Sequence, residues 1–194
     1  MATKNIHTWT YNVNHIKTSI GVLSSSTNNL DYIVKILKNR FHENWFDRML
    51  SDRRARINEG NKLRTLRKFK TVFKYEKYLD YIKDFKSRSN FCKFRISSHN
   101  LMIEIGRHSN IPVSDRICKK CELNEVEDEK HALMICPKHT EIRNNVFDII
   151  DAENKNFKAL DTESKFIWLL SNEDKQVITN LVKLINKITD LPRT

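Results

Sequence analysis

Glycine and proline are scarce in this sequence, with only three of each among 194 residues. A turn-dense all-β fold needs many such residues at its turns, so their scarcity argues against a sandwich or barrel and favours helices. No apolar run reaches the roughly 18 residues of a membrane-spanning helix, and the start of the chain lacks an apolar signal region. We therefore expect a mainly α-helical intracellular protein, cytoplasmic or nuclear, with little or no β-sheet and no contact with a membrane.

Cysteine is also infrequent, but three of the four cysteines fall in one stretch, Arg116–Pro137, together with a histidine. The spacing is Cys118-x2-Cys121-x9-His131-x4-Cys136. Two cysteines separated by two residues form a knuckle that aims both thiolates at one ion, and a His and a Cys about ten to fifteen residues further on complete a tetrahedron. The pattern predicts one structural Zn²⁺ of Cys3His type, with no position left open for water or substrate.

Other interpretations of these cysteines are an inert set of core thiols and a redox-active C-x-x-C pair. Neither accounts for the His and the third Cys at ligand spacing, and a redox motif would need a βαβ setting for which there is little strand signal. A catalytic zinc site, as in a deaminase, needs an open metal position and an H-x-E acid, which the surroundings of His131 and His139 do not both provide. His139 lies three residues after Cys136 and could replace it as the fourth ligand.

The net charge of +11 is unevenly distributed along the chain. Residues 35–95 contain 19 Lys or Arg and 7 Asp or Glu, a net charge of +12, which leaves −1 for the remainder. A concentrated basic excess is typical of proteins that bind the phosphate backbone of RNA or DNA. The alternative is a set of Lys-rich helices that are merely soluble.

Cations alternate with apolar residues over 51–70, so the apolar side chains would anchor the segment while the cations face outward. Arg forks match phosphate oxygens. The nucleic-acid contacts that we predict are Arg53, Arg54, Arg56, Lys62, Arg64, Arg67, Lys68 and Lys70, with Lys119 and Lys120 at the knuckle. A solvated helix face is the alternative for this segment.

Apolar residues at three- and four-residue steps predict the helices. They cover residues 30–50, 71–86, 140–151 and 174–191, and a shorter helix is capped by Ser97 or Ser98 and ended by Gly106. In the second of these, Tyr75, Tyr78, Tyr81 and Phe85 could stack on bases, although their helical spacing favours packing. Cys92, between Phe91 and Phe94, is expected to be buried and inert.

These patterns divide the chain into four parts. They are a poorly defined N-terminal segment (1–29), a basic helical region (30–110), the zinc knuckle (111–138) and C-terminal helices (139–194).

Four carboxylates precede His131, namely Glu125, Glu127, Asp128 and Glu129. Carboxylates favour a helix N-terminus, so we expect them to begin the helix that carries His131. Adjacent carboxylates at a helix start point in different directions, which argues against a magnesium site.

Two blocks of sequence resemble a known family. They are F-R-I-S-S-H-N-L-M-I-E-I-G-R-H at Phe94–His108 and D-R-I-C-K-K-C-E-L-N-E-V-E-D-E-K-H-A-L-M-I-C-P at Asp115–Pro137, followed by Arg143. In this order and spacing they resemble the C-terminal cysteine-rich region that follows the reverse transcriptase domain of many animal non-LTR (LINE-type) retrotransposon polyproteins. F-D-R-M-L-S-D and F-K-Y-E-K-Y-L upstream and F-I-W-L-L-S-N-E-D-K downstream extend the resemblance over about residues 9–190.

The resemblance implies a zinc-binding helical appendage of a reverse transcriptase that helps to hold template RNA or target DNA, with Cys118, Cys121, His131 and Cys136 as ligands. A polymerase needs paired aspartates for magnesium, and no Y-x-D-D or F-x-D-D stretch occurs; an endonuclease domain would not fit. We therefore expect no enzyme activity from this chain, which would be a fragment or decayed copy of such a polyprotein. The alternative function is a structural or protein-interaction appendage that docks on the polymerase core.

Overall fold

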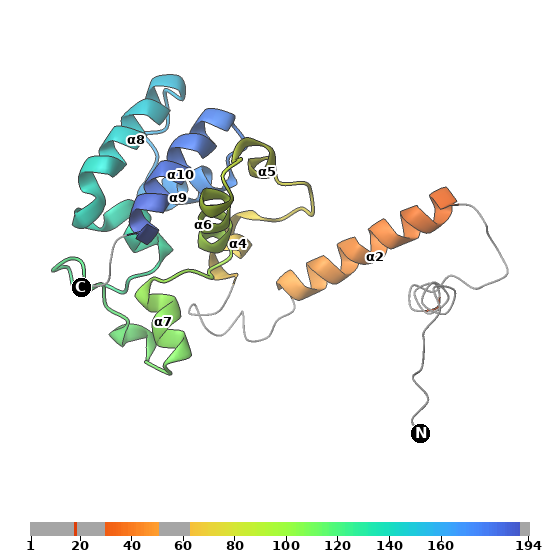
Figure 1. The fold of residues 1–194 in the computed structure, drawn as a ribbon, viewed down its shortest axis with the longest axis horizontal. Coiled ribbons are helices and arrows are strands. Elements are labelled where there is room, and N and C mark those ends of the chain that lie inside the picture. Colours follow the sequence, from red (N-terminus) through yellow and green to blue (C-terminus); the bar gives the residue numbers. More distant parts are fainter. Residues whose placement is uncertain (1–17, 19–29, 51–62, 191–194) are drawn as a thin grey trace. The chain divides into compact units, whose positions relative to one another are not determined.

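A computed structural model describes residue 18, residues 30–50 and residues 63–190 of the chain (Figure 1). The chain divides into two compact units, Met1–Ser51 and Asp52–Thr194. The described residues contain helices and no β-strand, with one isolated antiparallel bridge. The predicted mainly α-helical class is therefore confirmed for this part of the chain.

The described helix of the first unit, α2, runs from Leu30 to Leu50, the bounds predicted from its apolar periodicity. Apart from residue 18, the predicted N-terminal segment 1–29 lies outside the described residues. Large apolar side chains of α2 lie at its surface, and that of Phe41 is 64% exposed. The exposed cations of the helix include Lys35, Lys38 and Arg40.

The second unit is built around α10, which runs from Lys175 to Asp190 and packs against α6 (Phe85–Arg95) and α8 (Thr140–Glu153) (Figure 1). Its apolar stripe is fully buried; the side chains include Val177, Ile178, Leu181, Leu184, Ile185 and Ile188. Each contributes roughly 1.5–3 kcal/mol by leaving water. The Asp174 carboxylate caps the helix by accepting the amides of Gln176 and Val177. The helices predicted over 140–151 and 174–191 are thus confirmed to within two residues.

The helix predicted over 71–86 is wrong. Residues 71–76 are non-helical, α5 spans only Tyr78–Tyr81, and α6 starts afresh at Phe85. The carboxylate of Asp84 accepts the amide of Ser87 at 2.7 Å and forms an N-cap. A side chain that caps a new helix competes with continuation of the previous one, so the periodic pattern is divided there.

The predicted cap and end of the next helix are also wrong. The helix α7 spans Met102–His108 and follows Leu101, whereas Ser97 has a positive φ of 56° and its hydroxyl accepts the amide of Thr65. Gly106 lies inside α7, and a Cβ there would come within 2.5 Å of Cγ of Arg116. The glycine is therefore needed for close packing and does not end the helix.

Shorter elements complete the unit. The helix α4 spans Arg64–Phe69 and packs against α9, which spans Thr162–Ser171. The Asp161 carboxylate caps α9. The sequence pattern did not predict α9 as a helix. Three single turns are η1 (Val113–Asp115), η2 (His131–Ile135) and η3 (Pro137–His139).

Cys92 was predicted to be buried, but it is only half-buried and packs against the edge of the core. None of the described helices combines the length and apolarity required to span a bilayer.

Candidate metal centre

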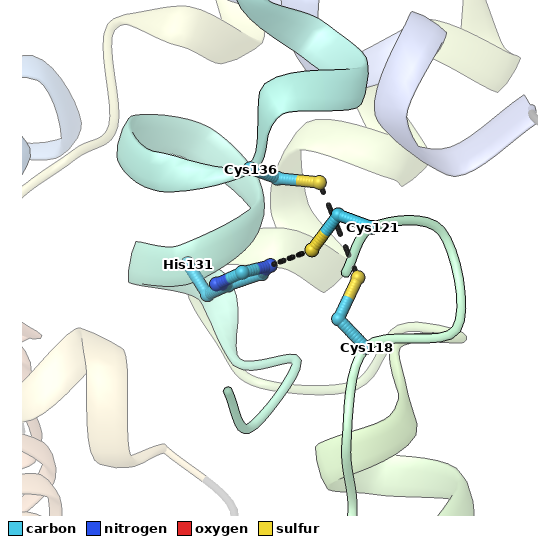
Figure 2. Close-up of side chains that lie close together, drawn as sticks. All are labelled: Cys118, Cys121, His131 and Cys136. Carbon is cyan, nitrogen blue, oxygen red and sulfur yellow. Dashed lines mark hydrogen bonds between the residues drawn. The ribbon is translucent and has the colours of Figure 1, made fainter. Parts of the chain in front are cut away.

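Four side chains from two separate parts of the chain meet at one point (Figure 2). They are Cys118, Cys121, His131 and Cys136, whose ligand atoms all lie within 4.8 Å of one another. The bridge between Ile117 and Val126 closes the loop that carries the first two cysteines, and it is flanked by a 2.8 Å bond from the amide of Cys118 to the carbonyl of Glu125. The predicted ligand set is thus brought together in space.

The spacing of these atoms fits a tetrahedral ion. Zinc–sulfur bonds of about 2.3 Å and zinc–nitrogen bonds of about 2.05 Å place two sulfurs about 3.8 Å apart and a sulfur and a nitrogen about 3.6 Å apart. The Sγ atoms of Cys118 and Cys136 are 4.0 Å apart, and Sγ of Cys121 is 3.4 Å from Nε2 of His131. Three thiols and one imidazole in this geometry could hold a thiophilic divalent ion such as Zn²⁺.

A single turn of π-helix positions the second half of the site. In η2 the amide of Cys136 donates to the carbonyl of His131 at 2.7 Å. Residues five apart on an α-helix would differ by about 140° in direction, whereas the wider π-turn brings them to the same side. Such turns are rare and are often found at functional sites. The same turn buries Ala132 and Leu133 in the core, which anchors the site.

Hydrogen bonds orient the buried imidazole of His131. Its Nδ1 lies 3.0 Å from a carboxylate oxygen of Glu125, and its backbone amide donates to Asp128 at 2.7 Å. A carboxylate on Nδ1 favours the tautomer that leaves Nε2 as the free ligand atom. Glu125 is therefore a supporting residue that the sequence interpretation treated only as part of a helix start.

Burial strongly affects the thiols. It raises the pKa of Cys118 to about 12, although a backbone hydrogen bond from Lys120 acts in the opposite direction. Burial also raises the pKa of Cys136, opposed by a backbone hydrogen bond from Lys138. Because thiolates are the ligands, binding of a divalent cation would have to release these protons, and acid would oppose binding.

The four carboxylates before His131 were predicted to begin the helix that carries it, but only Asp128 accepts the amide of His131, and residues 125–128 are not helical. The Glu127 side chain accepts the amide of Met102 at 2.8 Å and pairs with Lys120, whereas Glu129 pairs with Arg64 and His99. Glu125 and Asp128 contact His131. Two of the four thus contact the same residue, His131, and the other two pair with different cations; among the described residues the four are not grouped as a metal site.

His139 is buried close to the cluster but is not one of its four ligands. Burial, together with the charges of Lys120 and Arg143, lowers the pKa of His139 to about 4. Arg143 instead donates from Nη1 to the carbonyl of Cys136 at 2.9 Å. The geometry therefore favours Cys136 over His139 as the fourth ligand.

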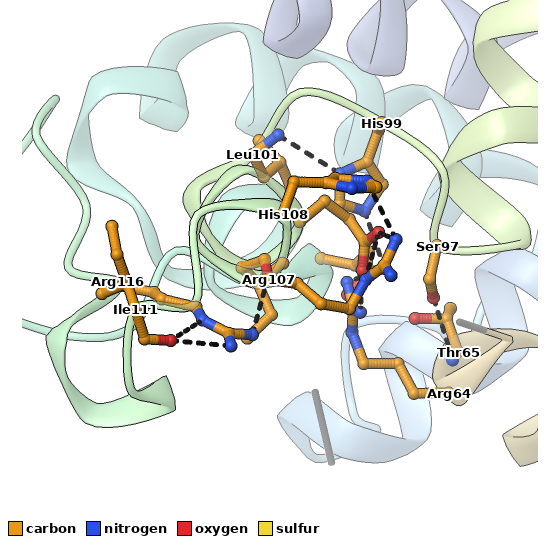
Figure 3. A network of polar contacts seen from close by, with 12 residues as sticks. Arg64, Thr65, Ser97, His99, Leu101, Arg107, His108, Ile111 and Arg116 are labelled. Carbon is orange, nitrogen blue, oxygen red and sulfur yellow. Dashed lines mark hydrogen bonds and ion pairs between the residues drawn. The ribbon is translucent and has the colours of Figure 1, made fainter. Parts of the chain in front are cut away.

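Figure 3 shows a network of polar contacts that includes Arg64 and Arg116. The Arg64 side chain is only 11% exposed and donates to both Glu104 and Glu129. Arg116 donates to the carbonyls of Ile103 and Ile111. Burial of paired charges depends on contacts between distant segments, so no sequence pattern predicts it.

The predicted phosphate contacts therefore differ in their surroundings. Arg64 is an internal ion-pair partner, which corrects its assignment as an outward-facing cation. The Lys70 side chain is 9% exposed and pairs with Glu76, and Lys120 pairs with Glu127 at 2.9 Å. Lys68 lies 2.8 Å from Glu163 at the surface, Lys119 is exposed, and Arg67 is half-buried. Arg53, Arg54, Arg56 and Lys62 lie outside the described residues.

Comparison with protein-family models, with curated proteins and with solved structures finds no match. The fold and the site together define the class of the protein: it is a mainly helical chain with a Cys3His group that could form a metal site.

Proposed function

We propose that this chain is a non-catalytic, zinc-stabilised module that binds RNA or DNA through the phosphate backbone. It would be of the kind that follows the reverse transcriptase domain of non-LTR retrotransposon polyproteins. The observation that carries the proposal is the concentration of positive charge, +12 over residues 35–95 against −1 elsewhere. Such a distribution attracts polyanions and produces salt-dependent binding.

The metal would have a structural role. Cys118, Cys121, His131 and Cys136 would hold the ion, and a site filled by four protein ligands leaves no position for a reacting molecule. When bound, zinc would join the loop after Ile117 to η2, and through η2 to the helical core. The donor atoms are already arranged within 4.8 Å, which supports this role.

An exposed aromatic ring on the second unit supports the proposal. Phe85, at the first position of α6, is 75% exposed. The exposed residues beside it in sequence are Lys83, Asp84 and Lys86, and Lys86 pairs with Asp190 at 3.1 Å. Aromatic rings between cations bind single strands by stacking on bases while the cations contact phosphates. Phe85 was predicted to pack inside a helix face; its exposure contradicts that prediction and supports the alternative role of stacking on bases.

Fluorescence anisotropy with a labelled single-stranded RNA and a DNA duplex tests this function. If about four phosphates are neutralised, the affinity should fall roughly 100-fold between 50 and 200 mM salt. Phe85→Ala should weaken single-strand binding by about 1–3 kcal/mol, and Lys83→Ala/Lys86→Ala should reduce the salt slope. The control Lys155→Ala/Lys187→Ala removes the same charge from other surface positions. Absence of binding at 20 mM salt would refute the proposal.

A second candidate function is docking on a polymerase core or other protein. The observation that favours it is the exposure of apolar side chains on α2, where Val34 is 44% and Phe41 64% exposed. This function predicts that the isolated chain self-associates in sedimentation velocity experiments and that Phe41→Ser reduces the association. A monomer at all concentrations would count against it.

A further inference from the structure

A cavity of about 430 Å³ lies within the second unit. The non-helical segment before α5 forms one wall, α6 contributes Phe91 and Arg95, and the loop between α9 and α10 contributes Glu173. Its volume falls in the range of pockets that hold small molecules. Phe69, Tyr78 and Phe91 give the cavity an aromatic lining.

Positive charge exceeds negative charge in the lining. Four cations and two carboxylates line the cavity, namely Lys70, Lys74, Lys77 and Arg95 with Glu76 and Glu173. Each carboxylate is shared by two cations, because Glu76 pairs with Lys70 and Arg95, and Glu173 pairs with Lys74 and Lys77. The formal charge of the lining residues is therefore +2.

Arg95 is the most confined of these cations. Its side chain is 8% exposed, and its guanidinium lies over the rings of Phe69 at 4.8 Å and Tyr78 at 5.1 Å. Nη1 donates to Glu76 at 2.7 Å. Nε is buried and has no hydrogen-bond partner among the described residues. An unpaired donor on a buried charged group is rare and unfavourable, so Arg95 is a positive charge in the cavity wall that is only partly compensated by the protein.

We propose that this cavity is a binding site for a phosphate monoester. A phosphate monoester carries a charge of about −1.5 to −2 at neutral pH and offers three acceptor oxygens, which matches the surplus of +2 in the lining. A carboxylate would supply only one charge. Lys74 and Lys77 can contact the same phosphate from the rim, and the aromatic lining accommodates the attached organic group. This site does not depend on the proposed binding of nucleic-acid backbone.

The cavity is tested with the full zinc-loaded chain by isothermal titration calorimetry. The probes are inorganic phosphate, adenosine 5′-monophosphate, and one short oligonucleotide with either a 5′-phosphate or a 5′-hydroxyl. We expect saturable binding of the monophosphate, weakened about tenfold or more by Lys74→Ala/Lys77→Ala because charged hydrogen bonds are lost. Glu173→Gln should tighten binding several-fold, since it removes a competing carboxylate from the rim.

Arg95→Lys keeps the charge but removes Nε and the planar fork, and it should also weaken phosphate binding about tenfold. Because Arg95 is buried, circular dichroism must show that this variant is folded. The rim variants test the site independently of that result. Lys155→Ala/Lys187→Ala, which removes the same charge outside the cavity, should leave the affinity for the monophosphate unchanged.

The phosphate comes from a strand terminus if the 5′-phosphorylated oligonucleotide binds more tightly than both the mononucleotide and the 5′-hydroxyl strand. Equal binding of mononucleotide and phosphorylated strand would identify a free nucleotide. The proposal is overturned if no phosphate probe binds saturably, if the two lysine pairs have equal effects, or if Glu173→Gln does not tighten binding. Failure of the phosphate site can be distinguished from failure of the proposed nucleic-acid function. If only the phosphate site is absent, the 5′-hydroxyl strand should still bind through its backbone, in the original chain and in Lys74→Ala/Lys77→Ala alike.

Discussion

The backbone amide of Cys136 donates to the carbonyl of His131 at 2.7 Å, which closes a π-turn and directs both side chains to the same point. His139, three residues further on, is buried outside the group of ligand atoms. The turn therefore distinguishes two candidates for the fourth ligand that have similar positions in the sequence.

Cys136→Ser should consequently lower zinc affinity by at least two orders of magnitude, because a thiolate ligand is lost from a four-ligand site. His139→Ala should keep one zinc per chain, although its burial means that some stability is lost. Metal analysis and competition with a chromophoric chelator measure both effects. If His139→Ala loses zinc and Cys136→Ser retains it, then His139, and not Cys136, is the fourth ligand.

Gly106→Ala should destabilise the second unit by about 1–3 kcal/mol. The new Cβ would lie 2.5 Å from Cγ of Arg116, whose guanidinium holds the carbonyls of Ile103 and Ile111. Urea unfolding measures the effect, with Asn144→Ala on the exposed face of α8 as the control. In an Arg116→Ala background the cost of Gly106→Ala should largely disappear; an unchanged cost would mean that the clash is not its cause.

Stability should depend on the ionised form of Glu104. Burial alone would raise the pKa of Glu104, but hydrogen bonds from Arg107 and Arg64 outweigh it, and the pKa lies below its usual range. A lowered carboxyl pKa means that the unfolded chain binds the proton more tightly. The stabilisation is therefore complete above about pH 4.5, the unfolded value, and is lost as the pH falls further.

The matching variant is Glu104→Gln, which should be less stable than the original chain by roughly 2 kcal/mol at pH 7. The difference should shrink as the pH is lowered below the unfolded value, and it should vanish below the lowered pKa of Glu104, where the carboxyl is protonated in the folded chain as well. Urea unfolding at a series of pH values measures it. Glu153→Gln, at an exposed position, is the control, and a difference that stays constant with pH would contradict the assignment.

The sequence predicted those helices whose apolar residues recur over many turns. The stripe of α10 is periodic from Val177 to Ile188, and burial of one continuous face then determines the structure. The apolar residues of α9 form the run F-I-W-L-L, which has no clear period, so its helix was not predicted. Over 71–86 periodicity was present, but the local cap by Asp84 divided the segment.

The metal ligands were predictable because their chemistry constrains spacing along the chain, whereas the supporting ion pairs were not. Arg64 is in the same basic stretch as Lys68, and only packing makes the first internal and leaves the second at the surface. Likewise, Glu104 and Glu129 belong to distant segments that meet through Arg64. Long-range pairing of this kind leaves no periodic signal.

Removal of zinc should loosen the segment around the metal centre without unfolding the helical core. The amides of Cys118 and Cys136 are held by bonds within this segment, to Glu125 and His131, whereas α10 is buried against α6 and α8. After treatment with a chelator, hydrogen exchange should accelerate by orders of magnitude over 117–136 and change little in α10. Cys92→Ser, which alters a cysteine outside the cluster, should retain zinc and the original exchange pattern. Equal acceleration in α10 would instead mean that the whole unit folds only with its metal, as zinc fingers do.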